Sequence, residues 1–233
     1  VAALGGRFRD KEGRALGPGG AALARINSIE LDGLDPRLAE CSIQVACDVN
    51  IPLCGEMGAW RFAAQKGATI DIMHELEQAM NRFADVVVDG VGVDLRDMPL
   101  AGPAGGLAGG LHAFLGAELL AGADLILDIT GMGKRIPGAD LVLVGEGRMD
   151  GNTFWGKGPA AIARGALASA VPVLAVVGQL GADAPDLPSR GIVGIETLLQ
   201  HAGSEEQAIA RAKELIPKAT EAVLKRFGSV DTW

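Results

Sequence analysis

The sequence predicts an α/β protein of two α/β domains, whose C-terminal part is Rossmann-like, with three layers and a mostly parallel sheet. From residue 140 onward, short apolar runs and helical patterns follow in the order strand, helix, strand, strand, helix. Unbroken apolar runs are typical of parallel strands that are covered on both faces. The 233 residues, 48% of them apolar, are also enough to bury a core.

Five apolar runs bounded by turn-forming residues predict the strands, at 42–49, 123–129, 141–144, 171–177 and 192–195. Four helices are expected. Residues 71–88 place apolar side chains at three- and four-residue steps, and 159–168 begin with proline at the first helical position. The others span 107–120 and 204–227, and Pro217 should kink the last one.

Residues 1–135 alternate less regularly between helix and strand, and we interpret them as part of a middle α/β domain. Residues 136–233 would form the C-terminal part of the Rossmann-like domain. No linker marks the boundary, which is expected near residues 134–138.

Composition excludes several functions. The net charge of −8, without a run of Lys and Arg, argues against nucleic-acid binding. No apolar stretch reaches the roughly 20 residues that span a bilayer, and the first residues lack a secretory signal, so a cytoplasmic protein without membrane insertion is expected. Cys41, Cys47 and Cys54 have no paired spacing and are expected to be reduced and mostly packed.

The stretch "VGEGRMDGNTFWGKGP" at 144–159 places four charged residues in a glycine-rich bend after a predicted strand. Ligands of open parallel sheets lie at the carboxyl ends of strands. Glu146 and Asp150 are candidates to hold Mg²⁺ or take a proton, and Arg148 and Lys157 to neutralise phosphate oxygens. The glycines that would let the backbone approach a ligand are Gly145 and Gly147. The alternative is an ordinary turn with solvated charges, and the sequence leaves both open.

A second glycine run, "AGPAGGLAGGLHAFLGAEL" at 101–119, precedes a helix. Gly102, Gly105 and Gly106 would form an anion cradle there, or else these small residues serve tight helix packing. The run lacks G-K-[ST] and is no Walker A loop. The G-x-G at Gly145 to Gly147 lacks a third glycine, which disfavours NAD.

Two further candidates lie in "ACDVNIPLCG" and "AQKGAT". Asp48 follows a predicted strand and is either a base or metal ligand or a turn-forming residue. Lys66 is either a phosphate contact or a cation at a helix C-terminus. With no paired histidines and no G-x-S-x-G motif, the remaining acids, Lys and Arg at glycine turns are typical of phosphoryl transfer.

The blocks "CDVNIPL", "QKGAT", the second glycine run and "DLVLVGEGRMDGNTFWGKGP" together resemble the glycerate kinase family, nearly end to end and in the family's order. Bacterial members of this family phosphorylate D-glycerate at its 2-hydroxyl with ATP and Mg²⁺. The resemblance implies an ATP-dependent kinase whose partners are glycerate and ATP; it leaves the oligomeric state open.

Carried over by position, the resemblance implies a cleft between two domains that receives six charged side chains and is lined by five glycines. Asp48 or Asp150 would orient or deprotonate the substrate hydroxyl, and Glu146 and Asp150 would hold Mg²⁺. The other members of this set are Lys66, Arg148, Lys157, Gly102, Gly105, Gly106, Gly145 and Gly147.

The chain also departs from the family. Members carry about 120 to 150 further residues before this point, including strands that complete the Rossmann-like sheet. Pro103 stands where a small residue is usual, and "CDVNIPL" replaces C-D-V-T-N-P-L. A sheet without its first strands exposes apolar edges. The alternative reading is therefore a truncated, non-catalytic binding or interaction fragment of that fold.

Overall fold

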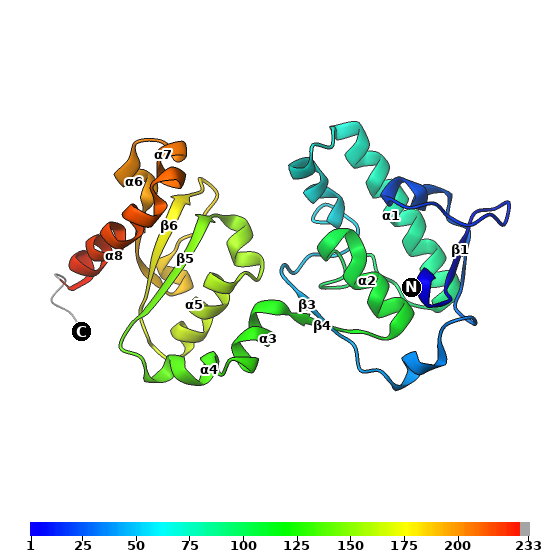
Figure 1. Cartoon of the computed structure of the whole chain (residues 1–233), viewed down its shortest axis with the longest axis horizontal. Helices are drawn as coiled ribbons and strands as arrows, with labels where there is room; N and C mark the ends of the chain where they lie inside the picture. Colours follow the sequence, from blue (N-terminus) through cyan, green and yellow to red (C-terminus); the bar gives the residue numbers. More distant parts are fainter. Residues whose placement is uncertain (229–233) are drawn as a thin grey trace. The chain divides into compact units, whose positions relative to one another are not determined.

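The computed structural model describes residues 1–228 and divides the chain into two compact units, Val1–Gly122 and Ala123–Trp233 (Figure 1). We refer to them as unit 1 and unit 2. The boundary expected near 134–138 falls inside unit 2, at the short helices α4 (Met132–Arg135) and η5 (Ile136–Gly138). Within residues 1–228 we find no helix with the length and apolarity that crossing a membrane demands.

Unit 2 contains a parallel sheet in the order β5-β6-β7. Its strands are β5 (Val142–Met149), β6 (Val173–Leu180) and β7 (Ile192–Thr197). All three lie where apolar runs predicted them, and their parallel pairing confirms the expected α/β class for this part of the chain. The helices in this part of the chain are α3 (Gly122–Ile129), α5 (Gly158–Ala168), α6 (Leu198–Ala202), α7 (Glu205–Ala210) and α8 (Ala212–Gly228), with the 3-10 helices η6 (Gly151–Trp155) and η7 (Pro188–Arg190).

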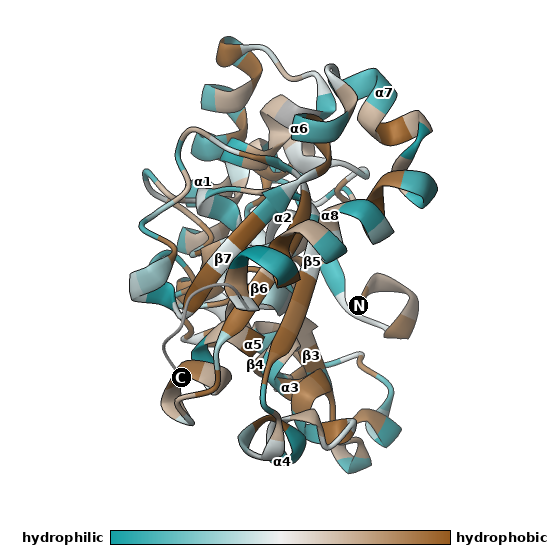
Figure 2. Cartoon of the chain, turned by 90° about the vertical axis from the view of Figure 1, so that its left-hand side faces the viewer, coloured by the Kyte–Doolittle hydropathy of each residue, from teal (hydrophilic) through white to brown (hydrophobic). Residues whose placement is uncertain are grey.

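Helices cover both faces of the sheet, whose strands Figure 2 shows largely in the brown of apolar residues. Successive side chains of a strand point to opposite faces, and the apolar residues of β6 therefore need a helix on each side. Val173 and Val177 of β6 pack with Ala163 and Ala166 of α5 in one apolar cluster. Val176 packs instead with the cluster formed by α6, α7 and α8. Figure 1 shows α5 on one side of the strands and α8 on the other.

Unit 1 is built from short elements. The strands β1 (Arg7–Arg9) and β2 (Ser28–Glu30) pair antiparallel, whereas β3 (Gln44–Cys47) and β4 (Glu118–Ala121) pair parallel. The core packs along the long helix α1 (Ile70–Val91), with Phe114 of α2 (Pro103–Leu115) and loop residues such as Leu53 and Leu95. The 3-10 helices are η1 (Ala2–Leu4), η2 (Gly20–Arg25), η3 (Pro36–Glu40) and η4 (Ala59–Lys66).

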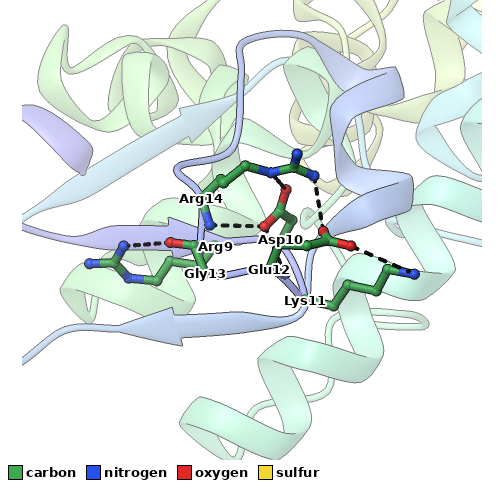
Figure 3. Close-up of polar contacts among 6 residues, drawn as sticks. All are labelled: Arg9, Asp10, Lys11, Glu12, Gly13 and Arg14. Carbon is green, nitrogen blue, oxygen red and sulfur yellow. Dashed lines mark hydrogen bonds and ion pairs between the residues drawn. The ribbon is translucent and has the colours of Figure 1, made fainter.

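The loop after β1 is closed by one carboxylate. Asp10, 7% exposed, accepts backbone N–H bonds from Glu12 and Arg14 at 3.0 and 2.9 Å. The guanidinium Nε of Arg14 donates to the other carboxylate oxygen at 2.9 Å (Figure 3). Asp10 is thus an acid whose oxygens are used by its own loop.

Four sequence predictions are corrected. The helix expected at 107–120 ends at Leu115, because Gly116 adopts a left-handed φ of 64° as its cap, and the chain then enters β4. Residues 123–129, expected as a strand, are helical; a short apolar run does not distinguish the two. The helix at 204–227 divides at Arg211 into α7 and α8, and α8 continues through Pro217. The bend expected from Val144 begins only after Met149, since β5 extends to that residue.

Candidate functional site

The first candidate site lies at the carboxyl end of β5, where Asp150 starts the 3-10 helix η6. One carboxylate oxygen of Asp150 accepts the backbone N–H of Asn152 at 3.0 Å. The backbone N–H of Asp150 donates to the hydroxyl of Thr153 at 3.1 Å. This reciprocal capping box fixes the chain direction as it leaves the strand.

Thr153 links this cap to Glu146. The threonine is 0% exposed, and its hydroxyl donates to Glu146 Oε1 at 2.7 Å while it accepts the N–H of Asp150. Burial raises the pKa of Glu146, whereas the hydrogen bond from Thr153 and the positive charge of Lys157 reduce that rise. The Glu146 carboxylate is therefore held in one place by a buried hydroxyl.

Two cations border the same network. Arg148 Nε donates to Asp150 Oδ2 at 3.1 Å, and its side chain remains 52% exposed. Lys157 is the N-cap residue of α5 and lies close enough to lower the pKa of Glu146. The free N–H groups of a helix N-terminus attract anions, so Lys157 and α5 together favour negative charge beside Glu146.

The glycines Gly145 and Gly147 lie within β5 rather than in a turn. A Cβ on Gly145 would lie 3.0 Å from the carbonyl oxygen of Val176, while one on Gly147 would meet open space. Gly178 of β6 packs against Gly147, where a Cβ would come within 2.3 Å of its carbonyl oxygen. Both β5 glycines line a groove of about 820 Å³, together with Glu146 and Arg148.

A second arrangement forms in unit 1, where the "CDVNIPL" and "AGPAGG" blocks pack against each other. The N–H of Gly102 donates to the carbonyl of Ile51 at 3.0 Å, and Asn50 Oδ1 accepts the N–H of Leu100 at 3.2 Å. A Cβ on Gly102 would lie 2.1 Å from the carbonyl oxygen of Pro52, so only glycine fits. The sequence did not predict this contact between the two blocks.

The backbone that follows Gly102 is strained. Ala104, Gly105 and Gly106 have φ values of 54°, 70° and 87°, and Leu100 just before them has 64°. Left-handed conformations cost alanine and leucine energy, and such residues cluster at functional sites. The helix expected to follow the glycines thus starts with a left-handed turn beside Ile51 and Pro52.

Asp48 and Lys66 are the two charged residues of unit 1 that the sequence analysis proposed for the site, and both are exposed. Asp48 directly follows β3, and within residues 1–228 its carboxylate makes no hydrogen bond or ion pair. Lys66 ends η4, where Gly67 caps the helix with a left-handed φ of 88°. η4 packs against α2, which carries the glycine run.

The structure thus brings together Glu146, Arg148, Asp150 and Lys157 in unit 2. In unit 1 it brings the residues that follow Asp48, Asn50 to Pro52, against Leu100 and Gly102, and no described contact joins Asp48 itself to the glycine run. Sequence reasoning missed Thr153, although D-x-x-T is a capping signal that was readable. It also missed Asp183, which follows β6 and accepts the N–H of Gly151 at 3.3 Å.

Metal binding by this site would depend on few protein ligands. Among residues 1–228, no group of three or more His, Cys, Asp or Glu side chains is arranged to hold a metal ion. Mg²⁺ is usually held by one or two carboxylates together with substrate phosphates. Glu146 and Asp150 at the end of β5 fit that shared kind of site, and do not fit a cage made of protein alone.

Comparison with known proteins gives a consistent result over the whole chain. A family model described as the glycerate kinase family matches residues 1–228. The chain is 39% identical over 219 residues to a glycerate kinase of Bacillus subtilis and 38% identical over 221 residues to a glycerate 2-kinase of Escherichia coli. These alignments cover 94% of this chain but only 57% and 58% of those relatives.

A solved structure supports the same fold. The crystal structure of a Salmonella typhimurium LT2 protein designated glycerate kinase 2 aligns with all of this chain at a TM-score of 0.65 and 34% identity. The alignment covers 61% of that protein. The chain therefore spans about three fifths of the length of the proteins it matches.

Proposed function

The chain belongs to the glycerate kinase family, and we propose that it supplies most of the active centre of an enzyme that transfers the γ-phosphoryl group of ATP to the 2-hydroxyl of D-glycerate. The observation that carries this proposal is the network of Glu146, Thr153, Asp150 and Arg148 at the end of β5. An ordinary turn would need neither a buried hydroxyl that holds Glu146 in place nor a cation that is paired with Asp150.

In this proposal unit 2 binds the phosphates of ATP. Arg148 and Lys157 offset the negative charge that spreads over the phosphoryl oxygens during transfer, and the N-terminus of α5 adds backbone donors. Gly145 and Gly147 let a ligand approach β5. Glu146 and Asp150 would hold Mg²⁺, which, when bound with ATP, neutralises further phosphate charge.

Unit 1 binds the hydroxy acid and accepts its hydroxyl proton. Asp48 is the better candidate for the base, because its carboxylate is exposed and unengaged, whereas both oxygens of Asp150 already accept hydrogen bonds. Asp48 would accept the proton of the substrate hydroxyl as the oxygen attacks phosphorus. Gly102, Gly105, Gly106 and Lys66 would bind the carboxylate of the hydroxy acid.

The direct test is a coupled assay of ADP release with ATP, Mg²⁺ and D-glycerate. We define the restored chain as this chain joined to the part of the Escherichia coli relative that has no counterpart here. We expect glycerate-dependent ADP release from the restored chain and little or none when glycerate is omitted. An intact, folded restored chain with no glycerate-dependent release would refute the assignment.

A second function is favoured by the chain's length relative to its relatives. Because it spans 57% to 61% of them, this chain alone could be a binding or interaction piece without catalysis. That function predicts that ATP with Mg²⁺ stabilises the chain equally in the parent and in Arg148→Gln and Asp150→Asn variants. A loss of that stabilisation in both variants favours the kinase.

A further inference from the structure

An acid on α1 that the proposed function does not use holds a turn of unit 1. Glu77 Oε1 accepts the backbone N–H of Gly55 at 2.7 Å and a side-chain N–H of Asn81 at 3.1 Å. The other carboxylate oxygen, Oε2, is buried, and no donor within residues 1–228 bonds to it. A buried carboxylate oxygen without a partner costs stability, and an acid kept there at that cost calls for a functional explanation.

The turn held by this acid spans residues 53–59 and is tightly closed. Gly55 has a left-handed φ of 85°, and its carbonyl accepts the N–H of Gly58 at 2.9 Å. A Cβ on Gly58 would lie 2.9 Å from that same carbonyl oxygen. The N–H of Ala59 donates to the carbonyl of Leu53 at 3.1 Å and so joins the two ends of the turn.

Both ends of the turn lead to the glycine run of α2. Leu53 is fully buried, and a Cβ on Gly106 would lie 2.5 Å from the Cδ1 atom of Leu53. At the other end, the indole Nε1 of Trp60 donates to the carbonyl of Gly55 at 2.7 Å. Trp60 belongs to η4, which packs against α2 and ends at Lys66. The turn therefore connects to two residues, Gly106 and Lys66, that we propose bind the carboxylate of the hydroxy acid.

Helix α1 contacts this region at a second point. The ring of Trp60 stacks on His74, with the ring centroids 6.5 Å apart and the planes inclined by 23°. His74 precedes Glu77 by one helical turn, so both contacts come from the same side of α1. The turn is thus attached to a long helix as well as to its own backbone.

We propose that Glu77 is a positioning residue for the binding of the hydroxy acid, an inference that rests on the function proposed above. Glu77 holds the turn at 53–59, and the turn keeps Leu53 against Gly106 and η4 against α2. The acid acts through the turn and has no contact with the substrate. Its removal should therefore weaken the binding of the hydroxy acid and leave the binding of ATP, which we assign to unit 2, as it is.

Amide hydrogen exchange of this chain tests whether Glu77 holds the turn. Glu77→Ala removes the acceptor of the Gly55 N–H, and we expect the amides of residues 54–59 to exchange at least about tenfold faster. Glu77→Gln keeps an acceptor oxygen and should restore the slow exchange. Glu75→Ala is the matched control, because Glu75 is exposed on the same helix and forms no hydrogen bond or ion pair within residues 1–228.

Steady-state kinetics of the restored chain test the consequence for the substrate. We expect Glu77→Ala to raise the KM for D-glycerate by about tenfold and to leave the KM for ATP unchanged, with Glu77→Gln close to the parent. A loss of folded protein alone would lower the apparent kcat and leave both KM values unchanged, so the split separates positioning from stability. Glu77→Met, which has a similar length and no acceptor oxygen, replaces Glu77→Ala if that variant does not fold.

Three results would overturn the proposal. Unchanged exchange at residues 54–59 in Glu77→Ala would show that the turn does not depend on this acid. Faster exchange with an unchanged KM for D-glycerate, or an equal rise of both KM values, would show that the turn does not position the hydroxy acid. A restored parent chain without glycerate-dependent turnover refutes the proposed function, and the positioning role falls with it, whereas the exchange rates still decide whether Glu77 holds the turn.

Discussion

Asp48 in unit 1 and Asp150 in unit 2 have the same setting in the sequence, yet the fold uses them differently. Each follows a parallel strand directly, β3 or β5. The oxygens of Asp150 accept from Asn152 and Arg148, whereas within residues 1–228 the Asp48 carboxylate has no partner and is exposed. An acid at a strand end can therefore organise its loop or stay available for chemistry, and only the contacts distinguish the two.

The glycines of the two units differ in the same manner. In unit 1, Gly105 and Gly106 adopt left-handed φ values that other residues rarely adopt. In unit 2, Gly145 and Gly147 lie within the strand β5. The missing side chain of Gly145 leaves room for the backbone of β6, and both glycines line the groove. A glycine-rich sequence thus forms a left-handed turn in unit 1, and in unit 2 it forms a strand whose glycines leave room for neighbouring atoms.

The largest effect is expected from Asp48→Asn in the restored chain. Removing a general base lowers turnover by roughly 100- to 10,000-fold, and an exposed carboxylate without partners should change the free energy of unfolding by less than about 0.5 kcal/mol. The coupled ADP assay and urea unfolding measure the two quantities.

Asp32→Asn is the matched control for this substitution, because Asp32 is exposed and lies just after β2. It should leave turnover unchanged. Turnover near the parent's in Asp48→Asn would remove the proposed difference between the two acids.

The next effect is on stability, from Thr153→Val. Valine has nearly the same shape but leaves Glu146 Oε1 and the N–H of Asp150 without their buried partner. The cost should be about 1 to 3 kcal/mol of unfolding free energy. Thr153→Ser keeps the hydroxyl and should recover most of this loss. Equal urea midpoints for Thr153→Val and the parent would show that the network does not hold the loop.

A smaller loss is expected from Asp150→Ala, which removes the cap of η6. N-cap replacements cost about 1 kcal/mol. Asp150→Asn retains a capping oxygen and should lose less. Thermal or urea unfolding of the three proteins compares them, and a larger loss for the asparagine variant would contradict the capping role.

The smallest effect concerns the pH dependence contributed by Glu146. Burial raises its pKa above the ordinary 4.5, so the folded chain holds this proton more tightly than the unfolded chain does. The group's contribution to stability therefore falls as the pH rises above that value. Glu146→Gln has no proton to lose and should gain stability relative to the parent between about pH 4 and about pH 7. Urea midpoints that differ by the same amount at both pH values would contradict this sign.

Sequence patterns predicted the elements whose signals are strong, in both units. The runs that form β5, β6 and β7 of unit 2 are apolar and bounded by turns, and α1 of unit 1 repeats its apolar positions over many turns. The predictions for residues 118–129 were wrong. A short apolar run suits either a strand or a helix, and Gly116 decides where α2 ends.

The site was predicted only in part, for a related reason. Charged residues among glycines stand out in a sequence, so Glu146, Arg148 and Asp150 were identified. A hydroxyl such as that of Thr153 adds no charge, and its importance comes from complete burial. Likewise, the contact between Ile51 and Gly102 depends on tertiary packing that no local pattern encodes.

The most direct test of the division of labour between the units is the thermal stabilisation of the restored chain by ATP with Mg²⁺, measured for Asp48→Asn and Arg148→Gln beside the parent. If unit 1 acts on the hydroxy acid and unit 2 on the phosphates, Asp48→Asn keeps the parent's ligand-dependent rise in Tm and Arg148→Gln loses most of it. A rise that disappears in Asp48→Asn and survives in Arg148→Gln would contradict the account.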